Sequence, residues 1–168
     1  MPDTDADTVT PLERGPSIRV LPKLDDANRF FWTAGQHDEL RFLRCQACRK
    51  YVHPPAPVCP YCLTGALEPE RVSGRGILHS YTVNHQQWVP GSGPYIVGLV
   101  TIDEQDDVRL MTNIVECDVD DLEIGMAMEV VFERAEDVWL PLFRPAASGS
   151  GSASGSVPGS SAAAGGQS

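Results

Sequence analysis

The sequence contains no long uninterrupted run of apolar residues and no export signal at its start. No stretch approaches the roughly 18 consecutive apolar residues of a membrane span. The first ten residues, MPDTDADTVT, are acidic and polar, whereas a signal peptide begins with basic residues followed by an apolar segment. We therefore expect a cytoplasmic protein with no membrane partner, whose reduced cysteines favour metal binding over disulfides.

The common catalytic motifs are also absent. There is no GxSxG, P-loop or GxGxxG motif, and the four histidines are not spaced as HxxxH or HExxH. Cys117, the unpaired cysteine, has acidic neighbours that raise the pKa of a thiol, which favours a small buried hydrophobe over a nucleophile. We predict that this chain contains no catalytic residue.

Acidic residues are missing from Leu40 to Leu67, although the whole chain has 23 acidic and 13 basic residues. The same stretch carries a group of cations that predicts a locally positive module suited to a small anionic ligand: Arg41, Arg44, Arg49 and Lys50. From Arg71 to Pro145 the balance reverses, with thirteen acidic residues against five arginines. Most of that second half would repel a nucleic acid, so we predict no nucleic-acid partner.

Four of the five cysteines form two CxxC pairs, Cys45/Cys48 and Cys59/Cys62. Two tight turns at this spacing aim four thiolates at one ion, which is typical of a zinc site or a rubredoxin-type iron site. Two disulfides are the alternative. We predict one structural zinc per chain, because four protein ligands leave no open position for water or substrate.

Composition and hydrophobic periodicity divide the chain into five segments. The first is rich in proline, and the last has neither charge nor any large apolar side chain except Val157, so neither can bury enough surface to fold alone. We expect an extended arm, a helix, a zinc ribbon, an OB-fold domain and a flexible tail, over residues 1–22, 23–38, 39–70, 71–145 and 146–168.

The predicted helix begins at Asp25-Asp26 and ends near Gly35. It carries three aromatic residues in succession, Phe30, Phe31 and Trp32, and one helix face cannot hold all three. They pack against the neighbouring domain or form a surface for a partner or ligand. Trp88 raises the same two alternatives, because it lies in a polar, glycine-rich loop between two predicted strands.

After Gly76 the pattern changes to the period of two that is typical of strands. Five short strands are predicted, over Ile77–Val83, Tyr95–Ile102, Val108–Val115, Met128–Phe132 and Trp139–Phe143. Their number and length favour a small closed barrel, most economically an OB-fold. The acidic run Asp103–Asp107 is interpreted as a solvated hairpin tip. The predicted fold is therefore mainly β, with an N-terminal helix and a rubredoxin-like zinc ribbon followed by a five-stranded OB-fold barrel.

From about Asp26 to Pro145 the chain resembles one family, the acyl-CoA-associated proteins catalogued as domain of unknown function 35. These proteins join a rubredoxin-like zinc ribbon to an OB-fold. The matching segments follow in the same order: FFWTAGQHDELRFLRCQAC, PPAPVCPYC, VSGRGILHSYTVNH, PYIVGLVTID, NIVECDVDDLEIGMAMEVVF and LPLFRP. One departure is Arg49, which stands where family members often have glycine, whose missing Cβ relaxes the first knuckle.

The resemblance implies a non-catalytic accessory subunit of a thiolase-superfamily enzyme, most specifically a retro-aldolase of steroid side-chain degradation. The catalytic residues would belong to the partner, in a hetero-oligomer such as a heterotetramer, with a MaoC-like hydratase as a possible further partner. This subunit would stabilise the partner and shape or channel the acyl-CoA thioester.

Within this interpretation two groups of residues become candidates. The cations Arg41, Arg44, Arg49 and Lys50 would contact CoA phosphates, and the aromatic residues Phe30, Phe31, Trp32 and Trp88 would anchor the partner. Three alternatives remain open. They are a free-standing acyl-CoA binding or delivery module, an accessory subunit of a thiolase, hydroxymethylglutaryl-CoA synthase or acyltransferase, and a nucleic-acid-binding OB protein.

Overall fold

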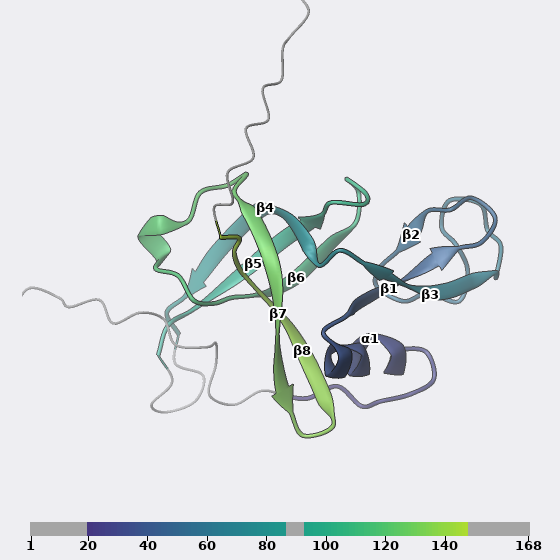
Figure 1. Ribbon diagram of the computed structural model, residues 1–168, viewed down its shortest axis with the longest axis horizontal. Helices are drawn as coiled ribbons and strands as arrows, with labels where there is room; N and C mark the ends of the chain where they lie inside the picture. Colours follow the sequence, from purple (N-terminus) through teal and green to yellow (C-terminus); the bar gives the residue numbers. More distant parts are fainter. Residues whose placement is uncertain (1–19, 87–92, 148–168) are drawn as a thin grey trace, which may run out of the picture.

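The computed structural model describes residues 20–86 and 93–147. Figure 1 shows a small three-stranded sheet beside a larger five-stranded barrel, with a short helix near their junction. The predicted fold class is confirmed: the chain is mainly β, with a ribbon followed by a closed barrel. Most of the predicted arm, Trp88 and nearly all of the predicted tail lie outside the described residues.

The N-terminal helix is shorter than predicted. Helix α1 (Arg29–Thr33) continues directly into a 3₁₀ turn, η1 (Ala34–His37). Before it, the Asp25 carboxylate accepts hydrogen bonds from the backbone N–H groups of Ala27 (2.9 Å) and Asn28 (3.0 Å). These bonds hold the first residues of the predicted helix in a side-chain-capped turn. In the described part of the chain no helix has the length and apolarity needed to cross a membrane.

The α-helix ends at Thr33, close to the predicted end at Gly35, and the 3₁₀ turn carries the element past this glycine. The element ends at Asp38, which has a φ of 55° and donates its backbone N–H to the carbonyl of Gly35 (3.1 Å). Gly35 instead lies against the barrel, where an added Cβ would be 2.5 Å from both Phe132 Cδ1 and Trp139 Cβ. Close packing therefore explains the glycine at this position.

The ribbon is an antiparallel sheet in the order β2-β1-β3, made of β1 (Leu40–Cys45), β2 (Tyr51–Val52) and β3 (Leu67–Val72). From the sequence only the first is predicted, as a short strand over Leu40–Arg44 that leads into the first knuckle. β2 has two residues, and β3 buries only its last residue fully, so neither shows the alternation by which strands are recognised.

The barrel contains the five predicted strands, with ends that differ by a few residues. They are β4 (Arg75–Asn84), β5 (Tyr95–Ile102), β6 (Arg109–Ile114), β7 (Ala127–Ala135) and β8 (Val138–Pro145). A short 3₁₀ turn, η2 (Val119–Asp121), lies between β6 and β7. The closed order β4-β5-β6-β8-β7, with a parallel contact between β6 and β8, is that of an OB-fold.

The parallel contact between β6 and β8 is short, and the helix lies where these strands separate. Their only register pair is Ile114 with Phe143. Further along, residues of α1, β6 and β8 together line a hollow of about 140 Å³. Phe31 and Trp32 reach this hollow from α1, so the N-terminal helix covers the weakest seam of the barrel.

The ribbon and the barrel share one hydrophobic core. Phe42, Tyr51 and Val72 from the ribbon belong to the same buried cluster as Leu78 and Ile96 from the barrel. A second, small cluster around Leu43 and Val52 includes two of the cysteines. The ribbon therefore has little core of its own apart from the metal-binding residues.

Candidate metal centre and the cationic surface beside it

The four cysteines of the two CxxC pairs meet at one point. Their sulfur atoms all lie within 4.8 Å of one another. Two of the separations are 3.5 Å, between the sulfurs of Cys45 and Cys62, and 3.6 Å, between those of Cys48 and Cys59. No cysteine in the described residues is in a disulfide, so the alternative of two disulfides is not realised.

These distances fit a tetrahedral metal site. A tetrahedron with metal–sulfur bonds of about 2.3 Å has edges of roughly 3.8 Å between sulfurs, close to the values above. Each close contact joins one cysteine of the first pair to one of the second, as expected when both turns bind the same ion. Four thiolates complete the coordination and leave no position for a substrate, so the site is suited to a structural role.

The backbone turns that carry the cysteines are alike. Arg49 donates its N–H to the carbonyl of Cys45 (2.9 Å), and Leu63 does the same to Cys59 (2.8 Å). Both residues follow the second cysteine of their pair and have positive φ values, 65° for Arg49 and 61° for Leu63. The knuckle therefore forms with arginine at the position where glycine is common in the family, at a cost of roughly 1–2 kcal/mol.

The first knuckle also stabilises a thiolate. The backbone N–H of Cys48 points to the sulfur of Cys45 at 3.4 Å. This hydrogen bond lowers the pKa of the Cys45 thiol to about 6. Because metals bind the deprotonated form of cysteine, the protein backbone itself favours the ligand state of this residue.

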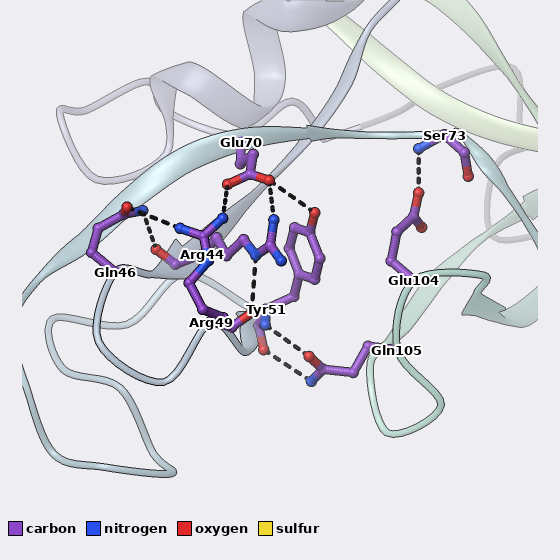
Figure 2. Close-up of polar contacts among 8 residues, drawn as sticks. All are labelled: Arg44, Gln46, Arg49, Tyr51, Glu70, Ser73, Glu104 and Gln105. Atoms are coloured by element: carbon purple, nitrogen blue, oxygen red, sulfur yellow. Dashed lines mark hydrogen bonds and ion pairs between the residues drawn. The ribbon is translucent and has the colours of Figure 1, made fainter.

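The four predicted cations do not form one free positive surface. Figure 2 shows Arg44 and Arg49 reaching the same carboxylate, that of Glu70 in β3. The hydroxyl of Tyr51 donates to the same group at 3.3 Å. Arg44 lowers the pKa of Glu70, which therefore stays ionised. Glu70 was overlooked in the sequence because it lies just outside the acid-free stretch. The pairing of β1 with β3 places Glu70 beside the cations of the first knuckle.

Arg41 lies apart from the other three cations. Its guanidinium pairs with Glu39 at 2.6 Å, whereas Arg44, Arg49 and Lys50 line a separate hollow of about 490 Å³. Acidic residues of the turn between β5 and β6 also line this hollow. In the described residues Lys50 has no ion pair within 4.0 Å, and its ammonium lies 5.8 Å from the centre of the Tyr61 ring.

The three aromatic residues of the helix have different environments. Phe31 is only 4% exposed and stacks on Phe42 with ring centres 6.0 Å apart. Phe30 borders a groove between α1 and the ribbon, and Trp32 is half-buried beside Phe31. Because Phe31 is buried, it has little surface for a partner, and Phe30 and Trp32 remain as the predicted interface residues of the helix. Trp88 lies outside the described residues.

The histidines do not form a cluster with other ligands. The described residues contain one group of three or more possible metal ligands, the four cysteines. Cys117 is partly buried, and burial with the nearby Asp118 raises the pKa of its thiol to about 11. Its chemistry therefore agrees with the predicted packing role and not with that of a nucleophile.

The turn between β5 and β6 is a feature that the sequence interpretation missed. It was interpreted as solvated, yet Gln105 at its centre is 8% exposed and contacts the backbone of Tyr51 in the ribbon (Figure 2). Gln105 is the only uncharged residue in the run Asp103–Asp107. The missing charge at Gln105 could have indicated that this position is buried, although it does not identify the partner, Tyr51, which is 54 residues away in the sequence.

Comparison with known families matches the two parts of the chain separately. Residues 32–68 match the family described as "ChsH2, rubredoxin-like zinc ribbon domain". Residues 69–133 match "ChsH2, C-terminal OB-fold domain". The matched ranges meet between Glu68 and Pro69, inside β3.

Three curated relatives have related names. A "Probable enoyl-CoA hydratase alpha subunit" of Thermomonospora curvata is 36% identical over 132 residues, which are 77% of this chain and 41% of that protein. The "3-oxo-4,17-pregnadiene-20-carboxyl-CoA hydratase alpha subunit" of Mycobacterium tuberculosis is 28% identical, over 80% of this chain and 43% of that protein. A "DUF35 domain-containing scaffold protein" of Methanothermobacter thermautotrophicus is 34% identical, over 56% and 71% respectively. The chain thus spans less than half of either hydratase subunit.

A solved structure is also similar over the folded region. Its description is "Ltp2-ChsH2(DUF35) aldolase", and the matched chain is 35% identical with a TM-score of 0.68. The match covers 76% of this chain and 100% of that one.

Proposed function

Because the chain belongs to the ChsH2 family, in which a rubredoxin-like zinc ribbon precedes an OB-fold, we propose that it is a non-catalytic accessory domain of an acyl-CoA aldolase. The catalytic residues lie in a thiolase-superfamily partner. The reaction is the retro-aldol cleavage of a steroid side chain carried as a CoA thioester. The domain stabilises the partner and shapes the entrance for the thioester.

The observation that carries this proposal is the match of 76% of this chain to the whole of a chain in the structure described as "Ltp2-ChsH2(DUF35) aldolase". The steroid substrate is supported by the name of the Mycobacterium tuberculosis relative. The accessory role agrees with the closed coordination of the cysteine site and with the word "scaffold" in the name of an archaeal relative. We further propose that the bound ion is zinc, that the assembly is a hetero-oligomer such as a heterotetramer, and that a MaoC-like hydratase supplies its substrate.

Contact with CoA is proposed for the hollow beside the first knuckle. Arg44, Arg49 and Lys50 border it, and a CoA phosphate would compete with Glu70 for the two arginines. Lys50 is the strongest candidate, because no carboxylate in the described residues pairs with it within 4.0 Å. Arg41 is the weakest, since it pairs with Glu39 and lies outside the hollow.

The test is co-expression of this chain with thiolase-like proteins encoded beside it, followed by affinity purification and an aldolase assay. We expect the partner to co-purify and to lose solubility or activity when this chain is omitted. The matched variant is Trp32→Ala, since Trp32 is half-buried on the helix. Its control is Ile124→Ala, an exposed apolar residue of the barrel that does not line the hollow beside Trp32. If no thiolase-superfamily protein depends on this chain, the accessory function is wrong.

A free-standing acyl-CoA delivery module is the second candidate, supported by the hollow lined with cations. Isothermal titration of the isolated chain with CoA esters separates the two candidates. Micromolar binding without a partner favours delivery, whereas binding that appears only in the complex favours the accessory role.

A further inference from the structure

The turn between β5 and β6, residues 103–107, packs against both metal-binding knuckles of the ribbon. Four of its five residues are exposed acids, and the fifth, Gln105, is buried. A buried amide needs hydrogen-bond partners, because its desolvation is costly otherwise. Apart from Asp107 and the backbone of the turn itself, the hydrogen-bond partners of Gln105 in the described residues belong to the ribbon.

The first knuckle is reached through Tyr51. The backbone N–H of Tyr51 donates to Oε1 of Gln105 at 2.8 Å, and Nε2 of Gln105 donates to the carbonyl of Tyr51 at 3.2 Å. Figure 2 shows this two-bond contact, which imitates the pairing of one residue in an antiparallel sheet. Because β2 is an edge strand, the side chain from the barrel covers backbone groups that would otherwise be unpaired.

The second knuckle is reached through Tyr61, which lies between Cys59 and Cys62 in the sequence. Its hydroxyl donates to Oδ2 of Asp107 at 2.8 Å and accepts from Nε2 of Gln105 at 3.1 Å. Tyr61 reaches the turn only while its knuckle keeps its present shape. That shape depends on two cysteines converging with those of the first knuckle.

We propose that metal binding and the seating of the ribbon on the barrel are coupled through these contacts. Gln105 is the positioning residue: one side chain bonds to the strand that leaves the first knuckle and to a tyrosine inside the second knuckle. When the cysteines release their ion, the second knuckle opens, Tyr61 withdraws, and the turn loses its contacts with both knuckles. The ribbon then becomes mobile relative to the barrel.

The coupling acts in both directions. If metal binding stabilises the contacts of the turn, those contacts must strengthen metal binding by the same factor. The turn is also the direct connection between β5 and β6, so a change in its packing reaches two strands of the barrel. The metal site thus influences a surface of the OB-fold although no cysteine of the site belongs to it.

Hydrogen exchange of the full chain, loaded with zinc and then stripped by a chelator, tests the proposal. We expect chelation to increase exchange in the segment from β5 through the turn to β6, while the β7–β8 hairpin exchanges at an unchanged rate. In Gln105→Ala the same segment should exchange faster even with zinc present. Competition with a chelator of known affinity should show zinc binding weakened on the order of tenfold in this variant.

Two further variants control for general destabilisation. Tyr61→Phe keeps the ring but removes both hydroxyl contacts, and should weaken zinc binding about threefold. Asp106→Asn changes an exposed neighbour that has no side-chain hydrogen bond in the described part of the chain, and should bind zinc like the wild type.

Three results would overturn the proposal. One is exchange in the turn that does not respond to chelation. Another is exchange that rises equally in the β7–β8 hairpin, which would indicate general unfolding. The third is wild-type zinc affinity in both Gln105→Ala and Tyr61→Phe.

Discussion

His53 is a histidine kept neutral by two aromatic rings. Its ring centre lies 4.6 Å from that of Phe42 and 5.2 Å from that of Phe31. Burial disfavours the charged imidazolium and lowers the pKa of His53 from 6.5 to about 4. The same residue takes up a proton near pH 6.5 once the chain unfolds, which links its environment to stability.

We predict that the free energy of unfolding falls by about 2 kcal/mol between pH 7 and pH 5 because of His53. Well above pH 6.5 both states are neutral at this residue and the effect disappears. Below pH 6.5 His53 is protonated in the unfolded chain, whereas in the folded chain it stays neutral down to about pH 4. Urea unfolding at the two pH values measures the loss.

The matched variant is His53→Phe, which keeps an aromatic ring and cannot titrate. Protonation of the cysteines also reduces stability in acid, but it does so equally in both proteins. The variant should therefore lose about 2 kcal/mol less than the wild type over this range. Equal losses would show that His53 is not held neutral.

For single residues, the sequence sufficed to predict contacts between side chains that are close together along the chain. The CxxC pairs lie within single turns, so their four thiolates could be assigned from spacing alone, and their sulfurs do converge. Glu70 and Gln105 could not be assigned, because their partners depend on strand pairing and on how ribbon and barrel meet. The ion pairs of the predicted cations with Glu39 and Glu70 were not foreseen either, and their contact with CoA stays a prediction.

At the scale of elements, the close packing of the helical segment on the barrel depends on a glycine, Gly35. Gly35 lies so close to β7 and β8 that an alanine Cβ would overlap Phe132 and Trp139. Alanine is otherwise the better residue in a helical turn by roughly 0.5–1 kcal/mol. Packing and helix propensity therefore make opposite predictions for this position.

We predict that Gly35→Ala lowers the free energy of unfolding by about 2 kcal/mol, since packing outweighs propensity. Denaturant unfolding measures the change. The control is Gly65→Ala, where the nearest atom to the added Cβ is the carbonyl oxygen of Pro57 at 3.8 Å, and the change should stay within about 0.5 kcal/mol. A more stable Gly35→Ala protein would refute the close contact.

The strands show where periodicity suffices and where it does not. β5 was predicted with its observed ends, because its residues alternate between buried and half-buried over the whole length. The ribbon strands β2 and β3 were missed, since a metal site and neighbouring strands stabilise them instead of a buried face. The helix was predicted too long because an acidic start fits a capped turn as well as a helix.

For the whole molecule, one continuous core joins two units that matched separate families. The ribbon contributes its own small cluster, of which Cys45 and Cys59 are buried members. So little apolar surface cannot fold a module of this size alone, and we expect a bound metal to supplement the core that the ribbon shares with the barrel.

We predict about one zinc per chain and a nearly complete loss of zinc in Cys59→Ser, with a large fall in melting temperature. Elemental analysis and thermal unfolding measure the two effects. Cys117→Ser is the control, because Cys117 lies outside the metal cluster, and it should keep its zinc. Retention of zinc in Cys59→Ser would mean that the four-thiolate site is wrongly assigned.

The helix that covers the seam between β6 and β8 also sets the order of events during synthesis. Its aromatic residues leave the ribosome more than a hundred residues before β8, the strand against which they pack. At about 5–20 residues per second, this delay lasts roughly 5–20 s. Until then Trp32 lacks the cluster of that strand against which it packs, Leu140 and Leu142, so a chain that stalls before residue 138 leaves this indole exposed to other proteins.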